Sequence, residues 1–271
     1  MASELENLNL ALFCDFENIA LGVRDAKYAK FDIQRVLEYL LVKGSIVVKK
    51  AYCDWDRYKD FKEAMHEAAF ELIEIPHLRQ SGKNSADIRM VVDALDLCYT
   101  KSHVDTFVII SGDSDFSPLV SKLRENAKTV IGVGVKNSTS DLLMSNCDEF
   151  IFYDDLVRKH EATNKARKSK KSTKSNTKGK TKAPSDDPLQ QAIDLVVETA
   201  EALHNERGDQ ENLWGSMIKQ ALKRRRPGFN ESYCGVKSFN KLLEEAQSRG
   251  YLDLELDERS GGYIIRRIAS E

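Results

Sequence analysis

Three aspartates follow two apolar segments of the sequence, at points where a buried strand would end. Asp15 comes directly after the apolar run LALFC, and Asp113 and Asp115 come directly after TFVIIS. Asp87 opens a further segment, KNSADIRMVVDAL, that has the apolar spacing of a helix. Carboxylates that gather in one place repel each other unless a cation neutralises them. Oxygen ligands of this kind favour Mg²⁺ or Mn²⁺, either of which can activate water against a phosphodiester.

The same carboxylates also have structural explanations. Aspartate is favoured at helix N-caps, which would account for Asp113 or Asp115 just before a helix expected at Ser117. Asp87 would complement the dipole of the helix that it opens. These explanations serve for one acid at a time, but four charges at strand ends would repel each other. We therefore treat the four acids as one candidate site.

Two polar residues and a further acid lie near this candidate site in the sequence. Asn18 lies one helical turn after Asp15 if the chain bends there, so its amide can hold a carboxylate or a metal-bound water. The Ser111 hydroxyl can orient carboxylates or water. Asp93 lies six residues after Asp87, which rotates it about 240° away on a helix, and we expect it to be structural.

Short β-branched segments alternate with amphipathic segments over the first 155 residues, which predicts an α/β domain with a doubly wound parallel sheet. In such sheets, ligands bind outside the carboxyl ends of the strands, where the strand order reverses. If the first and fourth strands are neighbours, the acids meet there. We expect strands at residues 10–14, 45–52, 72–75, 106–111, 129–135 and 149–152, and helices at residues 32–42, 57–70, 85–100, 117–126 and 140–146.

The composition is that of an ordinary globular protein, with 41% apolar and 31% charged residues in 271. No segment approaches the roughly 18 apolar residues of a membrane span, and the N-terminus lacks the pattern of a signal peptide. The five cysteines and five histidines are scattered, without the spacing of a disulfide framework or a zinc site. We therefore expect a cytoplasmic protein with no membrane partner.

The net charge of −2 conceals a strong asymmetry along the chain. Residues 1–157 carry a net charge of −8, residues 158–182 carry +10 and residues 183–271 carry −4. The basic segment has almost no large apolar side chain, so we expect a disordered linker over residues 158–187. Its lysines would attract phosphate backbones without sequence preference, and a purely solubilising linker is the alternative.

Residues 188–271 predict a second, small domain of the α+β class. Helices are expected from Pro188 to about Glu206 and within the segments LWGSMIKQALKRRRPGF and VKSFNKLLEEAQSRG. The last segment, YLDLELDERSGGYIIRR, alternates apolar and polar residues on both sides of a turn at Asp257–Gly262. Helices followed by such a β-hairpin are typical of a winged-helix domain.

The segments FCDFENI, NSADIRMVVDAL and VIISGDSDFSPLV, in this order and spacing, resemble an NYN domain of the LabA-like branch of PIN-like nucleases. The resemblance, over residues 8–157, implies a Rossmann-like, three-layer α/β fold and ribonuclease activity that depends on Mg²⁺ or Mn²⁺. It also extends to NSTSDLLMSNCDEFIFYDDL, where the family has a serine and a helix packed close to the site. The resemblance implies catalytic roles for Asp15, Asp87, Asp113 and Asp115, which are also the implied metal ligands, and for Asn18.

Residues 188–271 resemble an OST-HTH/LOTUS module, a winged-helix fold associated with RNA binding and with protein partners. The alternative for its basic residues is a solvated helix end whose cations complement the helix dipole. A homodimer, the identity of the RNA, the choice between endonuclease and exonuclease, and the number of metals stay open. The expected RNA contacts are Lys223, Arg224, Arg225, Arg226 and Lys237, together with Ser111 beside the acids.

The leading hypothesis is therefore a metal-dependent ribonuclease to which the C-terminal domain and the linker bring RNA. A non-catalytic RNA-binding regulatory adaptor is the main alternative. A phosphatase of the haloacid dehalogenase type is disfavoured because Glu17 stands where that chemistry needs an aspartate. A P-loop is disfavoured by His77 and Asn84, which replace its first glycine and its Ser or Thr. GDSDF lacks the G-x-S-x-G pattern of a serine hydrolase.

Overall fold

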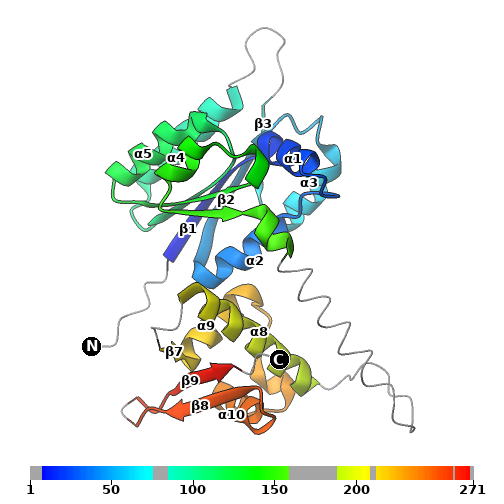
Figure 1. The fold of residues 1–271 in the computed structure, drawn as a ribbon, viewed down its shortest axis with the longest axis vertical. Coiled ribbons are helices and arrows are strands. Elements are labelled where there is room, and N and C mark those ends of the chain that lie inside the picture. The colour runs from blue at the N-terminus through cyan, green and yellow to red at the C-terminus, as the bar shows by residue number, and fades with distance from the viewer. Residues whose placement is uncertain (1–7, 76–84, 159–187, 208–211, 259, 269–271) are drawn as a thin grey trace, which may run out of the picture. The chain divides into compact units, whose positions relative to one another are not determined.

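The chain forms two compact units in a computed structural model, each built around its own sheet (Figure 1). The structure describes residues 8–75, 85–158, 188–207, 212–258 and 260–268. The predicted basic linker lies outside these residues from position 159 onward. None of the helices in the described ranges has the length and apolar character needed to cross a membrane.

The N-terminal unit contains a six-stranded parallel sheet with the strand order β3-β2-β1-β4-β5-β6. The order reverses between β1 and β4, which pair from Leu10 opposite Thr106 to Cys14 opposite Ile110. The predicted parallel α/β sheet and the predicted adjacency of these two strands are thereby confirmed. The strands are β1 (Leu8–Asp15), β2 (Gly44–Cys53), β3 (Glu71–Glu74), β4 (Thr106–Ile110), β5 (Thr129–Gly134) and β6 (Glu149–Phe152).

Helices cover both faces of this sheet and make three layers. The core on one face includes apolar side chains of α1 (Phe16–Asp25), α2 (Ile33–Lys43) and α3 (Lys59–Glu67). The core on the other face includes side chains of α4 (Ser85–Thr100), α5 (Ser117–Glu125) and α6 (Asp141–Asn146). Strands β1 and β4 are buried on both faces, which explains their unbroken apolar sequences.

Helix α1 was not predicted from the sequence, because it begins directly at the end of β1 without a loop. Its apolar residues Phe16, Ile19 and Val23 follow the strand at once, so the change from a period of 2 to a period of 3.6 is hidden. The side chain of Asp15 caps the helix by accepting a hydrogen bond from the Asn18 amide. The bend on which the expected role of Asn18 depended is therefore present.

The C-terminal unit packs three helices against a three-stranded antiparallel sheet with the order β7-β9-β8. Its core includes Ile193, Ile218 and Leu242, one from each long helix, all fully buried. The predicted helices and hairpin are present, whereas the short strand β7 was not predicted; the assignment to the winged-helix class stays a prediction. The elements are α8 (Pro188–Arg207), β7 (Leu213–Trp214), α9 (Gly215–Arg225), α10 (Phe239–Ser248), β8 (Leu252–Leu256) and β9 (Tyr263–Ile268).

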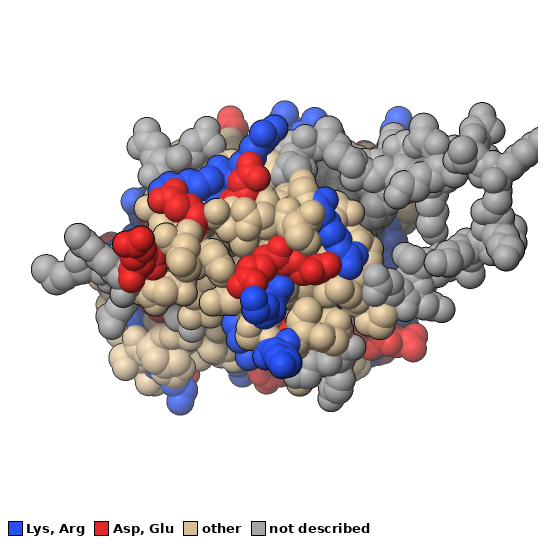
Figure 2. All heavy atoms as spheres, turned by 90° about the horizontal axis from the view of Figure 1, so that it is seen from below, with Lys and Arg blue, Asp and Glu red and all other residues tan. Residues whose placement is uncertain are grey.

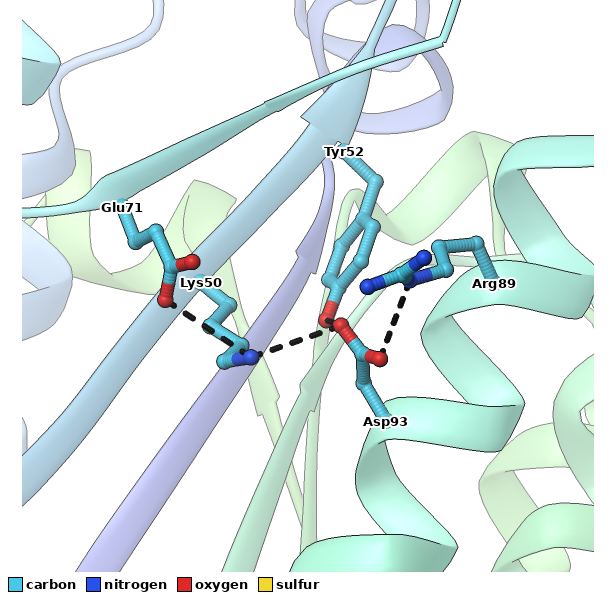
Figure 3. A network of polar contacts seen from close by, with 5 residues as sticks. All are labelled: Lys50, Tyr52, Glu71, Arg89 and Asp93. Atoms are coloured by element: carbon cyan, nitrogen blue, oxygen red, sulfur yellow. Dashed lines mark hydrogen bonds and ion pairs between the residues drawn. The ribbon is translucent and has the colours of Figure 1, made fainter.

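Asp93 ties α4, the helix that carries Asp87, to the sheet (Figure 3). Its carboxylate, 12% exposed, accepts a hydrogen bond from the Tyr52 hydroxyl at 2.9 Å and pairs with Arg89 Nε at 3.0 Å and Lys50 Nζ at 3.4 Å. Burial, and then the hydrogen bond to Asp93, raise the pKa of the Tyr52 phenol far above its usual range, so that phenol remains a donor. The network fixes α4 along β2.

We expect Asp93→Ala to lower the free energy of unfolding of this unit by roughly 2–4 kcal/mol, because it leaves the buried Tyr52 hydroxyl without its acceptor and Lys50 with Glu71 alone, at 3.6 Å. Asp96→Ala, on the exposed side of the same helix, should change it by less than about 0.5 kcal/mol. Urea unfolding, followed by the fluorescence of Trp55 in a Trp214→Phe background, measures both changes. Equal effects of the two substitutions would contradict a positioning role for Asp93.

Candidate active site

Asp15 is the most deeply buried acid of the site, with 7% of its surface exposed at the carboxyl end of β1. One carboxylate oxygen accepts a hydrogen bond from the Asn18 backbone N–H at 3.3 Å. The other accepts a hydrogen bond from the Ser111 hydroxyl at 2.9 Å. Asp15 is thus held from both sides, by the helix that follows β1 and by the loop that follows β4.

The loop after β4 is shaped by hydrogen bonds to side chains that the sequence had marked as candidates. The Asn18 side-chain oxygen accepts a hydrogen bond from the Gly112 N–H at 2.8 Å. Ser111 Oγ accepts one from the Asp113 N–H at 3.2 Å, and Asp113 Oδ1 accepts one from the Asp115 N–H at 3.0 Å. The bond to Asp113 forms the N-cap of a single 3₁₀ turn, η1 (Ser114–Phe116), that leads into α5.

Gly112 is needed because another segment passes close to this loop. A Cβ atom at position 112 would lie 2.4 Å from the backbone oxygen of Ser138. The Ser140 N–H donates a hydrogen bond of 2.9 Å to the Gly112 oxygen, and Ser140 also caps α6. The segment that resembles the family's serine and following helix therefore lies against the loop that carries Asp113.

Asp87 lies close to the other acids, since it lines one pocket together with Asp115. Burial, and then the charge of Asp87, raise the pKa of Asp15 to about 7, although its two hydrogen bonds oppose the shift. Burial, and then the charges of Asp113 and Asp115, raise the pKa of Asp87 to about 6. The structure thus brings the four predicted aspartates into one electrostatic cluster, in which Asp113 is half-buried and Asp115 is exposed.

Glu17 is an acid of this rim that sequence reasoning had set aside. Its charge contributes to the raised pKa of Asp87, and its carboxylate pairs with Arg57 at 3.2 Å. It lies in the first turn of α1, two residues after Asp15. The capping position of Asp15 would have placed Glu17 at the rim, had the start of α1 been recognised.

Ser111, expected as an RNA contact, is fully buried, and its hydroxyl serves Asp15 and Asp113. In the structure, Ser111 therefore orients Asp15 and the backbone of Asp113.

The basic residues expected to contact RNA lie in the C-terminal unit, and the structure does not gather them all on one exposed surface. Lys223 and Lys237 are exposed. Arg225 is largely buried against α8, where it donates hydrogen bonds to Glu198 at 3.0 Å and to Thr199 at 3.4 Å. Arg224 and Arg226 lie at the end of α9. The face shown in Figure 2 carries acidic and basic side chains in intermixed groups rather than one basic field.

The donor set at the crevice suits a hard cation. Within the described ranges, no three acidic, histidine or cysteine side chains stand close enough together to ligate one ion. Mg²⁺, however, is commonly held by one or two carboxylates and several water molecules, so a tight protein cage is not required. Burial is the main cause of the raised pKa values of Asp15 and Asp87, and the charges of neighbouring acids add to both shifts, so a cation would relieve repulsion already present.

Comparisons with known proteins find relatives that match a little more than half of this chain. An uncharacterized protein of Methanocaldococcus jannaschii is 27% identical over 145 residues, which are 53% of this chain and 57% of that protein. Meiosis regulator and mRNA stability factor 1 of Bos taurus is 27% identical over 154 residues, 56% of this chain and 9% of that protein. The chain thus matches little more than half of the archaeal relative and a small part of the mammalian one.

A crystal structure of a protein of unknown function from Vibrio parahaemolyticus is similar with a TM-score of 0.50 and 26% identity, covering 58% of this chain and 98% of that chain. The family model of the NYN domain matches residues 9–154, more than half of the sequence and the whole region that carries the acid cluster. This chain therefore belongs to the NYN domain family.

Proposed function

We propose that this protein is a ribonuclease that depends on a divalent metal and hydrolyses RNA phosphodiester bonds at its four aspartates. NYN and other PIN-like domains are generally nucleases, and this chain keeps an acid at every position expected from the family. The observation that carries the proposal is the convergence of Asp15 and Asp113 at the ends of β1 and β4, with Asp87 facing them from α4. Mg²⁺ and Mn²⁺ are the cations that this set of oxygen donors favours.

The chain's own residues supply the frame for this chemistry. Carboxylates among Asp15, Asp87, Asp113 and Asp115, together with water molecules, would hold the cation, which, when bound, would activate a water molecule and stabilise the leaving oxygen of the phosphodiester. The Ser111 hydroxyl and the Asn18 backbone N–H each donate a hydrogen bond to Asp15, and together they fix the orientation of its carboxylate. Asn18 also holds the Gly112 N–H and thereby the turn that presents Asp113.

RNA is the substrate that other features of this chain favour. The similar vertebrate protein is named as an mRNA stability factor, which supports RNA rather than a small phosphoester. The C-terminal unit has the order of helices and hairpin that the OST-HTH/LOTUS resemblance implies, and we propose that it binds RNA or a protein partner. The basic segment over residues 158–182 would add sequence-independent attraction to phosphates.

A non-catalytic RNA-binding adaptor is the second candidate function. The observation in its favour is that no three potential ligands of the described residues meet around one ion position. The adaptor predicts RNA binding without turnover in Mg²⁺ and in Mn²⁺, so the same experiment decides between the two.

The purified full-length protein should cleave labelled RNA when Mg²⁺ or Mn²⁺ is present, and Asp113→Asn should reduce the rate by roughly 100-fold or more, because even residues behind metal ligands typically cost 10–100-fold. Asp96→Asn makes the same change of charge on the exposed side of α4 and should leave the rate unchanged. Gel analysis of 5′-labelled RNA measures the rates. Cleavage that survives in Asp113→Asn would refute the proposed site.

Asp15→Asn should stabilise the metal-free protein at pH 8 and have much less effect at pH 4. The pKa of Asp15 is about 7 when folded and near 3.8 when unfolded, so the penalty for burying the ionised group grows between these two pH values and is complete above pH 7. Below the unfolded pKa both states are protonated and the penalty disappears. A shift of this size corresponds to roughly 4 kcal/mol at most, and we expect a gain of about 2 kcal/mol at pH 8.

Urea unfolding in the presence of a chelator, followed by Trp55 fluorescence in the Trp214→Phe background, measures the difference between variant and parent at both pH values. A variant that is less stable than its parent at pH 8 would show that Asp15 is not under electrostatic stress.

A further inference from the structure

A groove lies beside the acid cluster, lined by residues of α4, of η1 and the start of α5, and of α6. Its apolar lining consists of Ile88, Val91 and Val92 from α4, with Pro118 and Leu142 from the facing helices. Its volume is about 730 Å³, within the range of about 300–1,000 Å³ that is typical of ligand clefts. We call it the α4–α6 groove. It is large enough for the base of a nucleotide.

Three side chains of this groove are unusually exposed for large apolar residues. Ile88 is 62% exposed, Leu142 is 57% exposed and Val92 is 54% exposed. They are three of the six exposed large hydrophobic residues in the described part of the chain. Apolar surface left in water costs roughly 25 cal/mol per Å², and contiguous apolar patches on soluble proteins mark binding sites. The groove is therefore a surface that gains free energy when it is covered.

The α4–α6 groove runs directly into the acid cluster, because Asp87 and Asp115 line it together with the apolar residues. No lysine or arginine among the described residues lines it, so the groove has no positive charge that would attract a phosphate. Ser114 and Asn146 add hydrogen-bonding groups. Ser117, which is 6% exposed, also lines the groove, and its hydroxyl has no hydrogen-bond partner in the described ranges.

We propose that the α4–α6 groove holds an unpaired nucleobase next to the phosphate that is cut. The inference rests on the proposed ribonuclease function. A base has two apolar faces and a polar edge, which match the apolar lining and the hydroxyl and amide groups of the groove. A base inside a duplex is stacked and paired and cannot enter, whereas single strands offer their bases to protein surfaces.

A second copy of this chain is the less favourable occupant. An apolar partner surface that covered Ile88 and Leu142 would also cover Asp87 and Asp115, which line the same groove. Covering two carboxylates with an apolar surface is costly unless each finds a partner there. A nucleotide avoids this cost, because its phosphate would share a cation with the acids.

The test compares Val92→Ser and Leu142→Ser with Val47→Ser, which replaces a valine of similar exposure, 44%, on β2 and outside the groove. Labelled single-stranded RNA is titrated with full-length protein in Ca²⁺, and fluorescence anisotropy reports binding while gels verify that the RNA stays intact. We expect the groove variants to weaken binding about 5- to 20-fold, which corresponds to roughly 1–1.8 kcal/mol and lies at the lower end of what a base contact contributes, and Val47→Ser to leave it unchanged.

The same proteins are then titrated with RNA in which the bases, but not the sugars and phosphates, are removed from a central stretch. The parent protein should lose affinity for this RNA, and the groove variants should lose less affinity than the parent does, because they already lack the base contact. The proposal would be overturned if the groove substitutions weakened the binding of intact RNA and of base-free RNA by the same factor. Unchanged binding of intact RNA by both groove variants would also overturn it. Light scattering is measured in parallel, and a parent dimer that the groove substitutions dissociate would assign the groove to a second copy instead.

Cleavage assays in Mg²⁺ and Mn²⁺ separate this inference from the function on which it rests. Absence of cleavage together with groove-dependent binding would refute the ribonuclease and retain the base site. Cleavage that is abolished by Asp113→Asn but is equally fast on single strands and on the perfect duplex, in parent and groove variants alike, would retain the ribonuclease and refute the base site. The expected result is a raised KM on single strands for Val92→Ser and Leu142→Ser with kcat changed by less than about 2-fold.

Discussion

Two opposing influences set the charge state of the Asp15 carboxylate at the end of β1, and the acid cluster of the N-terminal unit is built around that carboxylate. Hydrogen bonds from Ser111 and from the Asn18 N–H favour its charged form, whereas burial and the charge of Asp87 oppose that form. The opposing influences prevail, because the pKa of Asp15 rises to about 7. A buried acid in this state gains more from a bound cation than an exposed acid of ordinary pKa would.

The fold explains why these acids meet and why they stay in place. The reversal of strand order between β1 and β4 opens the crevice, and the loop after β4 is fixed by Asn18 through the Gly112 N–H. Asp87 arrives from α4, whose position along β2 depends on the pairing of Asp93 with Tyr52, Arg89 and Lys50. Residues that bear no part in the chemistry thus set the distance between those that do.

The sequence predicted the sheet and the acid cluster because unbroken apolar strands and the acids after them are local patterns. It did not predict α1, which starts without a loop, or the nearness of Glu17 to Asp87, which follows from that start. Nor did it predict the groove. Helix α4 has apolar residues on two sides, and periodicity alone cannot tell that Met90 is packed in the core whereas Ile88 and Val92 are exposed.

The charge state of Asp15 is the quantity that tests this account most directly. A ¹³C NMR titration of its side-chain carboxyl, in metal-free protein and again with saturating Mg²⁺, measures the pKa in both states. We expect a pKa of about 7 without metal and a value well below that with Mg²⁺, as the cation replaces the proton. An ordinary pKa near 4 in the metal-free protein, or a raised pKa that Mg²⁺ does not lower, would contradict the account.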